Sequence, residues 1–440
     1  MTDRARPPTG AAAAAEEPAA AGGRDAVVDA AAAAARDAVV EAAAAAARES
    51  HAQIVATLIR VTGDWTLAED CAQEALVQAL QRWPADGVPA NPAGWLTTVA
   101  RNRATDVLRR ATVERRKLRE LATLAPTEDA APRAGEEEVV DDRLRLIFTC
   151  CHPALALDAR VALTLRTICG IPTADIARAF LVTESTMTRR LTRARTKIAD
   201  ARIPYAVPAG PALAERLPGV LAVLYLLFTR GYDDGGGEPA FADEAIRLAR
   251  LLDDLMPGQP EIAALLALFL LQHSRRHARR DAHGDLVPLD RQDRARWDHA
   301  AIAEALSVLS RAGEDGPYAL QARIAACHAT APSFDATDWP AIATWYDALA
   351  HRSPSPVVAL NRAVAHGYAH GPAAGLALLV EARAGGALDG YPLALAAEAD
   401  LTARAGDRER AAALFRQAAA ETHAEPERRA LLDRARELFP

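Results

Sequence analysis

Arginine side chains crowd two stretches of the sequence, and they are the first residues whose type and spacing suggest a chemical task. Residues 95–119 carry seven Arg and Lys117 against two acids, and residues 160–202 carry eight Arg and Lys197 against three acids. Guanidinium and ammonium groups pair with phosphate oxygens, so the two stretches predict contact with a nucleic-acid backbone. Charge alone leaves a second interpretation open, namely two solvent-exposed helical faces.

An acidic spacer separates the two basic stretches. Residues 120–142 hold eight acids and only Arg133. The chain of 440 residues has a formal net charge of −7, and the part from residue 203 onward supplies that deficit. The overall acidity therefore does not exclude a nucleic-acid partner, because the positive charge is concentrated in two segments.

Other residues that suggest chemistry do not form a convincing site. Cys150, Cys151 and His152 are adjacent, with Cys169 nearby, but zinc ligands usually stand two to four residues apart, and Pro153 follows at once. The Gly-rich run at 231–238 is acidic and would repel phosphates. We therefore predict no metal, no cofactor and no catalytic group, so the protein is not expected to be an enzyme.

Helical periodicity identifies the elements that must position the first basic stretch. One buried stripe is predicted on a helix over 68–83, formed by Leu67, Cys71, Ala75, Leu76, Ala79, Leu80 and Trp83. Its other face carries Glu69, Asp70, Gln73, Glu74 and Gln78. Asn91 and Pro92 then read as an N-cap and a first helical residue, which predicts a second helix over 92–110.

The second basic stretch has the pattern of a helix-turn-helix. A short helix begins near Pro172, a turn follows Phe180, and Thr183 is the expected N-cap of the next helix. The predicted core stripe of that helix is Met187, Leu191, Ala194 and Ile198. A linker over 120–141 could reach about 70 Å when fully stretched, which allows the two basic helices to bind separate stretches of one duplex.

The rest of the chain is predicted to be helical. Residues 1–48 are an Ala-rich repeat with too little apolar bulk for a core, and we interpret them as a low-complexity tail. Residues 204–440 are Ala/Leu-rich helices with a loose repeat of 35–38 residues, close to that of tetratricopeptide (TPR) arrays. The fold class is therefore all-α. Five Cys, no apolar run of membrane-spanning length and no secretory signal predict a cytoplasmic protein.

Three separated motifs resemble one family. They are AEDCAQEALVQALQRW at 68–83, PAGWLTTVARNRATDVLRR at 92–110, and the helix-turn-helix at 172–198. Together they resemble an extracytoplasmic-function (ECF) sigma factor, of the sigma-70 family, of bacterial RNA polymerase. The phrases LRLIFTCCHPAL, FLVTESTMTRRL and DGPYALQARIAACHA are similar to the subgroup with a TPR-like helical C-terminal extension. The resemblance implies sigma region 2 at 49–119, region 4 at 142–203 and the extension at 204–440.

The resemblance also implies roles for individual residues. Contact with core RNA polymerase would fall to Asp70, Gln73, Glu74 and Gln78. Contact with the minus-10 element of promoter DNA would fall to Trp95, Arg101, Asn102, Arg103, Asp106, Arg109 and Arg110. A Trp in this place is more often part of a core than a base-stacking platform. Contact with the minus-35 element would fall to Thr183, Glu184, Ser185, Thr186, Arg189, Arg190, Arg193, Arg195 and Lys197.

The function implied is promoter-specific initiation of transcription, with the extension regulating the sigma domains in cis through intramolecular contact. The alternative is a helix-turn-helix repressor that acts without polymerase. A third reading places a small-molecule site in the extension, around Tyr225, Tyr232 and Trp297. The sequence does not specify the promoter, the inducing signal or the sign of the extension's effect.

Overall fold

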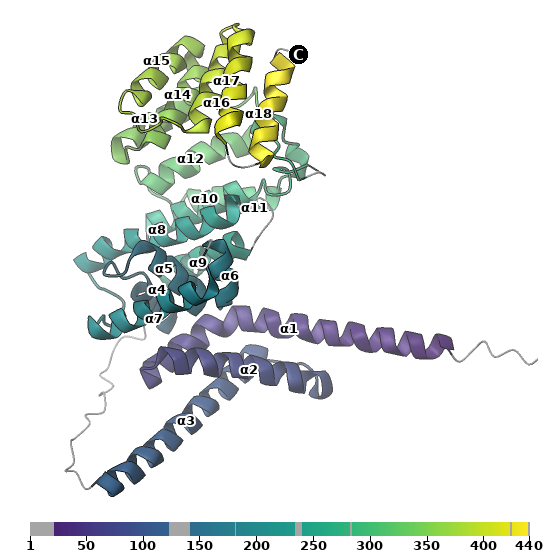
Figure 1. The fold of residues 1–440 in the computed structure, drawn as a ribbon, viewed down its shortest axis with the longest axis vertical. Helices are drawn as coiled ribbons and strands as arrows, with labels where there is room; N and C mark the ends of the chain where they lie inside the picture. Colours follow the sequence, from purple (N-terminus) through teal and green to yellow (C-terminus); the bar gives the residue numbers. More distant parts are fainter. Residues whose placement is uncertain are drawn as a thin grey trace, which may run out of the picture. The chain divides into compact units, whose positions relative to one another are not determined.

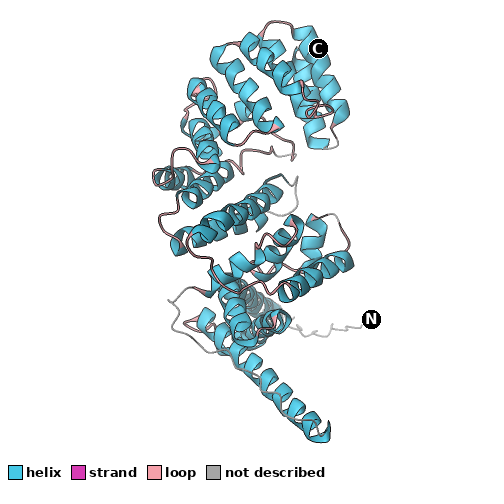
Figure 2. Ribbon diagram, turned by 90° about the vertical axis from the view of Figure 1, so that its left-hand side faces the viewer, coloured by secondary structure: helices cyan, strands magenta, loops and turns pink. Residues whose placement is uncertain are grey.

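The computed structural model describes residues 22–122, 141–180, 182–233, 240–281, 284–422 and 425–438. Over these ranges the chain is helical, without a β-strand, which confirms the all-α class (Figures 1 and 2). The described helices belong to two compact units. The first unit contains α1–α3 and the short segment Thr167–Gly170, and the second contains α4–α18 apart from Thr167, the last residue of α5.

The first unit is built from three helices, α1 (Gly22–Thr62), α2 (Trp65–Asp86) and α3 (Pro92–Ala122). Gly63, at φ 67°, ends α1, and the Asp64 carboxylate caps α2 by accepting hydrogen bonds from the backbone N–H groups of Thr66 and Leu67. The 22 residues of α2 span about 33 Å. The unit's core includes Ile54, Val55, Leu58, Ile59, Ala75, Ala79, Trp83, Leu96 and Ala100, all buried.

Two boundaries drawn from the sequence are displaced. Helix α1 runs across the predicted end of the tail at residue 48, and Ala43 and Ala46 are buried. The tail was interpreted as having too little apolar bulk to build a core, and these two small side chains are buried because they allow close helix packing. Helix α3 continues to Ala122, so the predicted linker begins later. Residues 123–140 of that linker, and residues 1–21, lie outside the described chain.

Four short helices begin the second unit: α4 (Asp142–Cys150), α5 (Leu157–Thr167), α6 (Thr173–Ala179) and α7 (Glu184–Asp200). Helices α6 and α7 pack against each other as the two helices of the predicted helix-turn-helix. Asp141 caps α4 and Thr183 caps α7. Most of α4 is buried, so neighbouring elements must cover more than one of its faces.

The extension forms a succession of helices in which neighbours in sequence pack as pairs (Figure 1). They are α8 (Pro211–Asp233), α9 (Ala240–Leu255), α10 (Pro260–His273), α11 (His299–Leu309), α12 (Pro317–Thr330), α13 (Trp339–Arg352), α14 (Pro356–His370), α15 (Pro372–Arg383), α16 (Pro392–Arg404), α17 (Arg408–Glu421) and α18 (Glu425–Leu438). Two short 3-10 turns, η1 (Leu289–Arg291) and η2 (Arg294–Arg296), precede α11. Many of these helices start with Pro, which needs no N–H partner there.

Helix α8 corrects one sequence expectation. Its residues Pro211–Arg230 are long and apolar enough to cross a membrane by length and composition, although no such run was predicted. The contacts are those of a core helix. Val220, Leu224 and Leu227 are buried, and the ring of Phe228 stacks on Phe269 of α10 at 4.3 Å.

Helix α4 is covered partly by the segment that enters the extension. The Tyr205 hydroxyl donates to the Asp142 carbonyl at 3.3 Å, and the Thr149 hydroxyl approaches the Pro204 carbonyl at 3.4 Å. From α8, the Arg216 guanidinium donates to the Phe148 carbonyl. Hydrogen bonds therefore connect α4 to the segment that follows α7 and to the first turns of α8.

Candidate nucleic-acid interface

The predicted polymerase-facing residues lie on α2 with different degrees of exposure. Asp70 and Gln73 are exposed, whereas Glu74 and Gln78 are half-buried. Glu69, which the helical pattern also assigned to this face, is buried instead. Asp70 and Gln73 lie three residues apart, so their side chains share one face of the helix.

Glu74 and Arg103 contact each other across α2 and α3. The Arg103 Nε donates to the Glu74 carboxylate at 2.7 Å, and both side chains are more than a third exposed. The sequence assigned these residues to two different partners, polymerase and DNA. A pair this exposed contributes only about 0–1 kcal/mol, so it orients both side chains without preventing another partner from engaging them.

Sequence reasoning missed two apolar side chains on the exposed side of α2. Val77 is 50% exposed and Leu80 is 38% exposed. Leu80 was expected in the buried stripe, but it lies about 100° around the helix from Ala79, which places it off the stripe's centre. Val77 stands four residues after Gln73, so an apolar strip adjoins the polar residues of the same face. The sequence did contain a signal for this, because Gln73, Val77 and Leu80 have the i, i+4, i+7 spacing of residues on one helical face.

Helix α3 presents its basic residues on an open face. The Asn91 side chain accepts a hydrogen bond from the Gly94 N–H at 2.9 Å, which confirms the predicted N-cap. Leu96, Ala100 and Ala104 are buried and fix the rotation of the helix. That rotation leaves one group of predicted minus-10 residues exposed: Arg101, Asn102, Asp106, Arg109 and Arg110.

Trp95 takes a packing position rather than a free one. Its ring meets the buried Trp83 ring edge-on, with centroids 5.5 Å apart and planes at 67°. Aromatic pairs favour this geometry. Trp95 is half-buried, and part of its ring is therefore packed against the core residue Trp83. The alternative of a core Trp therefore has more structural support than base stacking.

Helix α7 has the two faces that a recognition helix needs. Met187, Leu191, Ala194 and Ile198 are all buried, which confirms the predicted core stripe. The Thr183 hydroxyl accepts the Thr186 N–H at 3.3 Å and fixes the first turn. Six of the predicted minus-35 residues are exposed: Thr183, Glu184, Ser185, Arg189, Arg193 and Lys197.

Three predicted minus-35 residues do not lie on that open face. Thr186, Arg190 and Arg195 are half-buried. Arg190 pairs with Asp158 of α5 at 3.5 Å, and its guanidinium lies 5.6 Å from the centre of the Phe180 ring. Thr186 and Arg190 line a groove of about 380 Å³ between α7 and the start of α5. Arg193 and Lys197 line the same groove.

The cysteine and histidine run at the end of α4 is a packed structure. Cys150 and Cys151 are buried, and burial raises the pKa of the Cys151 thiol to about 11, partly offset by the Thr164 hydroxyl. A protonated thiol is a poor metal ligand and a poor nucleophile. Burial, followed by Arg216 and Arg160, lowers the pKa of His152. Over the described residues, no group of three or more His, Cys, Asp or Glu is placed to hold a metal ion.

The residues proposed for a small-molecule site are not gathered in one cavity. Tyr225 packs against Tyr318 with ring centroids 5.7 Å apart, and Trp297 borders a separate hollow of about 440 Å³ with Arg294 and His299. The Tyr232 side chain lies outside the described residues.

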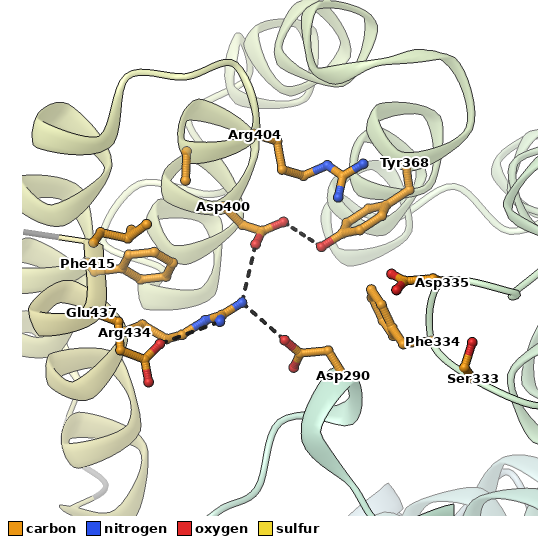
Figure 3. Close-up of a pocket in the computed structure, with 12 residues that line it drawn as sticks. Asp290, Ser333, Phe334, Asp335, Tyr368, Asp400, Arg404, Phe415, Arg434 and Glu437 are labelled. Atoms are coloured by element: carbon orange, nitrogen blue, oxygen red, sulfur yellow. Dashed lines mark hydrogen bonds and ion pairs between the residues drawn. The ribbon is translucent and has the colours of Figure 1, made fainter.

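A larger hollow of about 530 Å³ lies near the C-terminus (Figure 3). Arg434 extends between Asp290, Asp400 and Glu437, and the Tyr368 hydroxyl donates to Asp400 at 2.7 Å (Figure 3). These charges largely satisfy one another, so the network ties α18 to α16 and to η1.

Family models match the two DNA-binding segments and part of the extension. Sigma-70 region 2 matches residues 47–113, and sigma-70 region 4 matches residues 145–198. A family of unknown function (DUF6596) matches residues 216–313. The ECF RNA polymerase sigma factor SigL of Mycobacterium tuberculosis is 33% identical over 136 residues, 30% of this chain and 73% of SigL. The chain belongs to the ECF sigma factors.

Two further relatives extend the comparison of this sigma factor. The probable ECF RNA polymerase sigma factor SigI of M. tuberculosis is 29% identical over 154 residues, 34% of this chain and 52% of SigI. An uncharacterized protein of Rhizobium meliloti is 44% identical over 337 residues, 74% of this chain and 80% of that protein. No solved structure matches. At 337 residues, the longer match exceeds both the part before residue 204 and the part after it, so it includes some of each.

Proposed function

We propose that this sigma factor binds core RNA polymerase, recognises minus-10 and minus-35 elements, and directs transcription initiation in the cytoplasm. The observation that carries the proposal is the exposed N-terminal half of α7 above its buried stripe, inside the segment that matches sigma-70 region 4. The N-terminal residues of a recognition helix are those that reach base edges in the major groove. The factor has no chemistry of its own in this account, because bond formation belongs to the polymerase.

Each partner is assigned a surface. Polymerase binds the α2 face that carries Asp70 and Gln73, with Val77 and Leu80 supplying apolar area. The minus-10 element binds the open face of α3, where Asn102 and Asp106 are suited to base edges and the Arg residues to phosphates. Glu74 and Arg103 are assigned to the borders of these two surfaces, since they pair with each other.

The minus-35 element binds α7. Thr183, Glu184, Ser185 and Arg189 are assigned to base reading, and Arg193 and Lys197 to phosphates. Arg195, Thr186 and Arg190 are assigned supporting roles because they are half-buried.

The extension is proposed to regulate the factor in cis through region 4. The support is physical contact inside the second unit, where Tyr205 and Arg216 hydrogen-bond to backbone carbonyls of α4. A partner is not required for such control, because the regulator and the DNA-binding part are one chain.

Run-off transcription with purified core polymerase tests the sigma assignment. Asn102→Ala with Arg101→Ala, or Arg189→Ala with Arg193→Ala, should each reduce specific initiation at least tenfold without loss of polymerase binding. Arg436→Ala on α18 is the control, because Arg436 is 70% exposed and, among the described residues, its ion pair is with Asp433 of the same helix. A wild-type chain that binds duplex DNA but neither joins nor activates polymerase would instead support the repressor alternative.

A further inference from the structure

Helix α8 contacts region 4 at two places along its length and passes near α5 between them. Arg216 reaches the Phe148 carbonyl at the end of α4, and Gly219 faces Arg160 of α5, whose nearest guanidinium nitrogen would be 3.8 Å from an added Cβ. Arg230 reaches Phe180 at the end of α6. Arg216 and Arg230 are 14 positions apart, which is about 21 Å along a helix. One helix of the extension therefore spans region 4 from α4 to the helix-turn-helix.

Phe180 occupies the position from which the turn to α7 begins. Its N–H donates to the Ile176 carbonyl at 3.0 Å, ending α6, and the Val182 N–H donates back to the Ala177 carbonyl at 3.0 Å. Displacement of the Phe180 ring would therefore act on the short turn that sets the angle between α6 and α7.

Two arginines from different helices hold that ring. The Arg230 guanidinium lies 4.1 Å from the ring centre, and the Arg190 guanidinium lies 5.6 Å from it. Both distances fall within the range of a cation–π interaction. Asp158 of α5 pairs with Arg190 at 3.5 Å and offsets the repulsion between the two cations. Arg190 is thus held on the inner side of α7 and connects α5, α6 and α7.

The extension leaves the reading face of α7 uncovered. Ser185, Arg189 and Arg193 are exposed in the same unit in which α8 contacts Phe180. A helix that blocked promoter binding within this unit would bury those side chains. The contact therefore supports the recognition helix from behind.

We propose that Arg230 is a positioning residue for minus-35 recognition, acting through the Phe180 ring and Arg190 to hold α7 at its reading angle. The extension then contributes to promoter binding instead of blocking it. This inference rests on the proposed function, since it states that regulation in cis is activating and names the residue through which it acts.

The test uses the full chain with three substitutions at two positions. Arg230→Met removes the cation but keeps a long side chain, and Arg230→Lys restores a cation. Phe180→Leu removes the ring and keeps an apolar residue. Arg436→Met is the matched control, an arginine on α18 that contacts only its own helix turn in the described ion pairs.

Two measurements separate positioning from general destabilisation. The first is hydrogen exchange of the α7 amides, residues 184–198, in the full chain without polymerase. The second is the affinity of holoenzyme for a promoter with a matched or a scrambled minus-35 element. Arg230→Met and Phe180→Leu should speed exchange in α7 and cut the matched-to-scrambled ratio by about five- to tenfold. Arg230→Lys should recover most of that ratio, and Arg436→Met should leave it unchanged.

The double variant decides whether Arg230 acts through the ring. If it does, Arg230→Met combined with Phe180→Leu should lose little more than either single change. Independent, additive losses would overturn the inference, as would an unchanged ratio in Arg230→Met or a gain in promoter binding. Failure of wild-type holoenzyme to initiate would instead count against the proposed function, and the α7 exchange rates would still report on the contact.

Discussion

Arg190 and Arg193 stand within one turn of α7, yet their surroundings differ. Arg193 is exposed, whereas Arg190 is half-buried and pairs with Asp158. Arg193→Ala should weaken promoter binding across sequences and reduce the salt slope of log affinity by about one, with an unchanged melting temperature. Arg190→Ala should lower the melting temperature by a few degrees as well. Holoenzyme–promoter titrations at several salt concentrations, with thermal melts, distinguish them; equal melting temperatures would contradict the supporting role of Arg190.

His328 predicts how the extension responds to acid. Burial, then Arg275 and Arg294, lowers the pKa of His328 to about 4, so the ring is neutral in the fold. An unfolded chain binds this proton near pH 6.5. The contribution of neutral His328 to the free energy of unfolding is therefore fully present above pH 6.5 and is lost as the pH falls toward 4. The loss is about 2–3 kcal/mol, at roughly 1.4 kcal/mol per pH unit.

Urea unfolding between pH 7.5 and 4.5 measures this loss. His328→Gln should flatten the pH dependence, because the titrating group is gone. His370→Gln on the exposed end of α14 is the control for the loss of a histidine at the surface. A wild-type slope in the His328 variant would show that other groups cause the acid sensitivity.

The residue scale also shows what the sequence could predict. The buried stripe of α7 followed from helical spacing, because Met187 and Leu191 repeat at the period of one helix. The pairing of Arg190 could not be predicted, since Asp158 and Phe180 lie 32 and 10 positions away and meet it only after three helices pack. Leu80 was wrongly predicted to be buried. It lies at the edge of an apolar stripe, where the spacing of residues does not distinguish buried side chains from exposed ones.

At the scale of elements, helices α14 and α15 pack unusually closely. A Cβ added at Gly375 would lie 2.7 Å from the Gly367 Cα and 2.7 Å from the Ala363 carbonyl oxygen, both backbone atoms. Gly375→Ala should therefore force the helices apart and destabilise the extension by about 1–3 kcal/mol. Gly385→Ala is the control, because nothing lies within 4 Å of its added Cβ. Equal unfolding midpoints for the two variants would contradict the close approach.

Element boundaries were predictable where a cap or a Pro marks them and less so elsewhere. Asn91 and Thr183 cap α3 and α7 as expected from the sequence. The end of α3 was set too early, because its later turns are polar and lack an apolar stripe. The sequence pattern did not reveal the buried positions of the Ala-rich tail. Ala43 and Ala46 are small enough to be buried without standing out as hydrophobic in the pattern.

At the scale of the whole molecule, region 4 and the extension should behave as one folding unit. The α4 carbonyls of Asp142 and Phe148 receive hydrogen bonds from Tyr205 and Arg216. A chain ending at residue 203 loses both donors and all of α8. It should therefore melt at a lower temperature in region 4 than a chain ending at 281, which retains α8–α10. Circular dichroism melts of the two truncations check this, and coincident transitions would show that region 4 is autonomous.

The family could be predicted from three separated motifs, and intramolecular contact of the extension with the sigma domains was expected, but the residues that make such contacts could not be predicted. The sequence placed a domain boundary at 203/204, because composition changes there. In the structure, contacts cross that point through Pro204 and Tyr205. Such contacts depend on tertiary packing between helices that sequence periodicity treats separately.

Run-off transcription with purified core polymerase tests the central claim most directly. The template carries a promoter from upstream of the gene, and each reaction contains the full chain, the chain ending at 203, or no factor. A promoter-specific sigma factor supported by its extension gives a single specific start site with the full chain, a strongly reduced product with the truncation, and none without factor. No specific transcript from the full chain, despite its binding to core polymerase, would contradict the account.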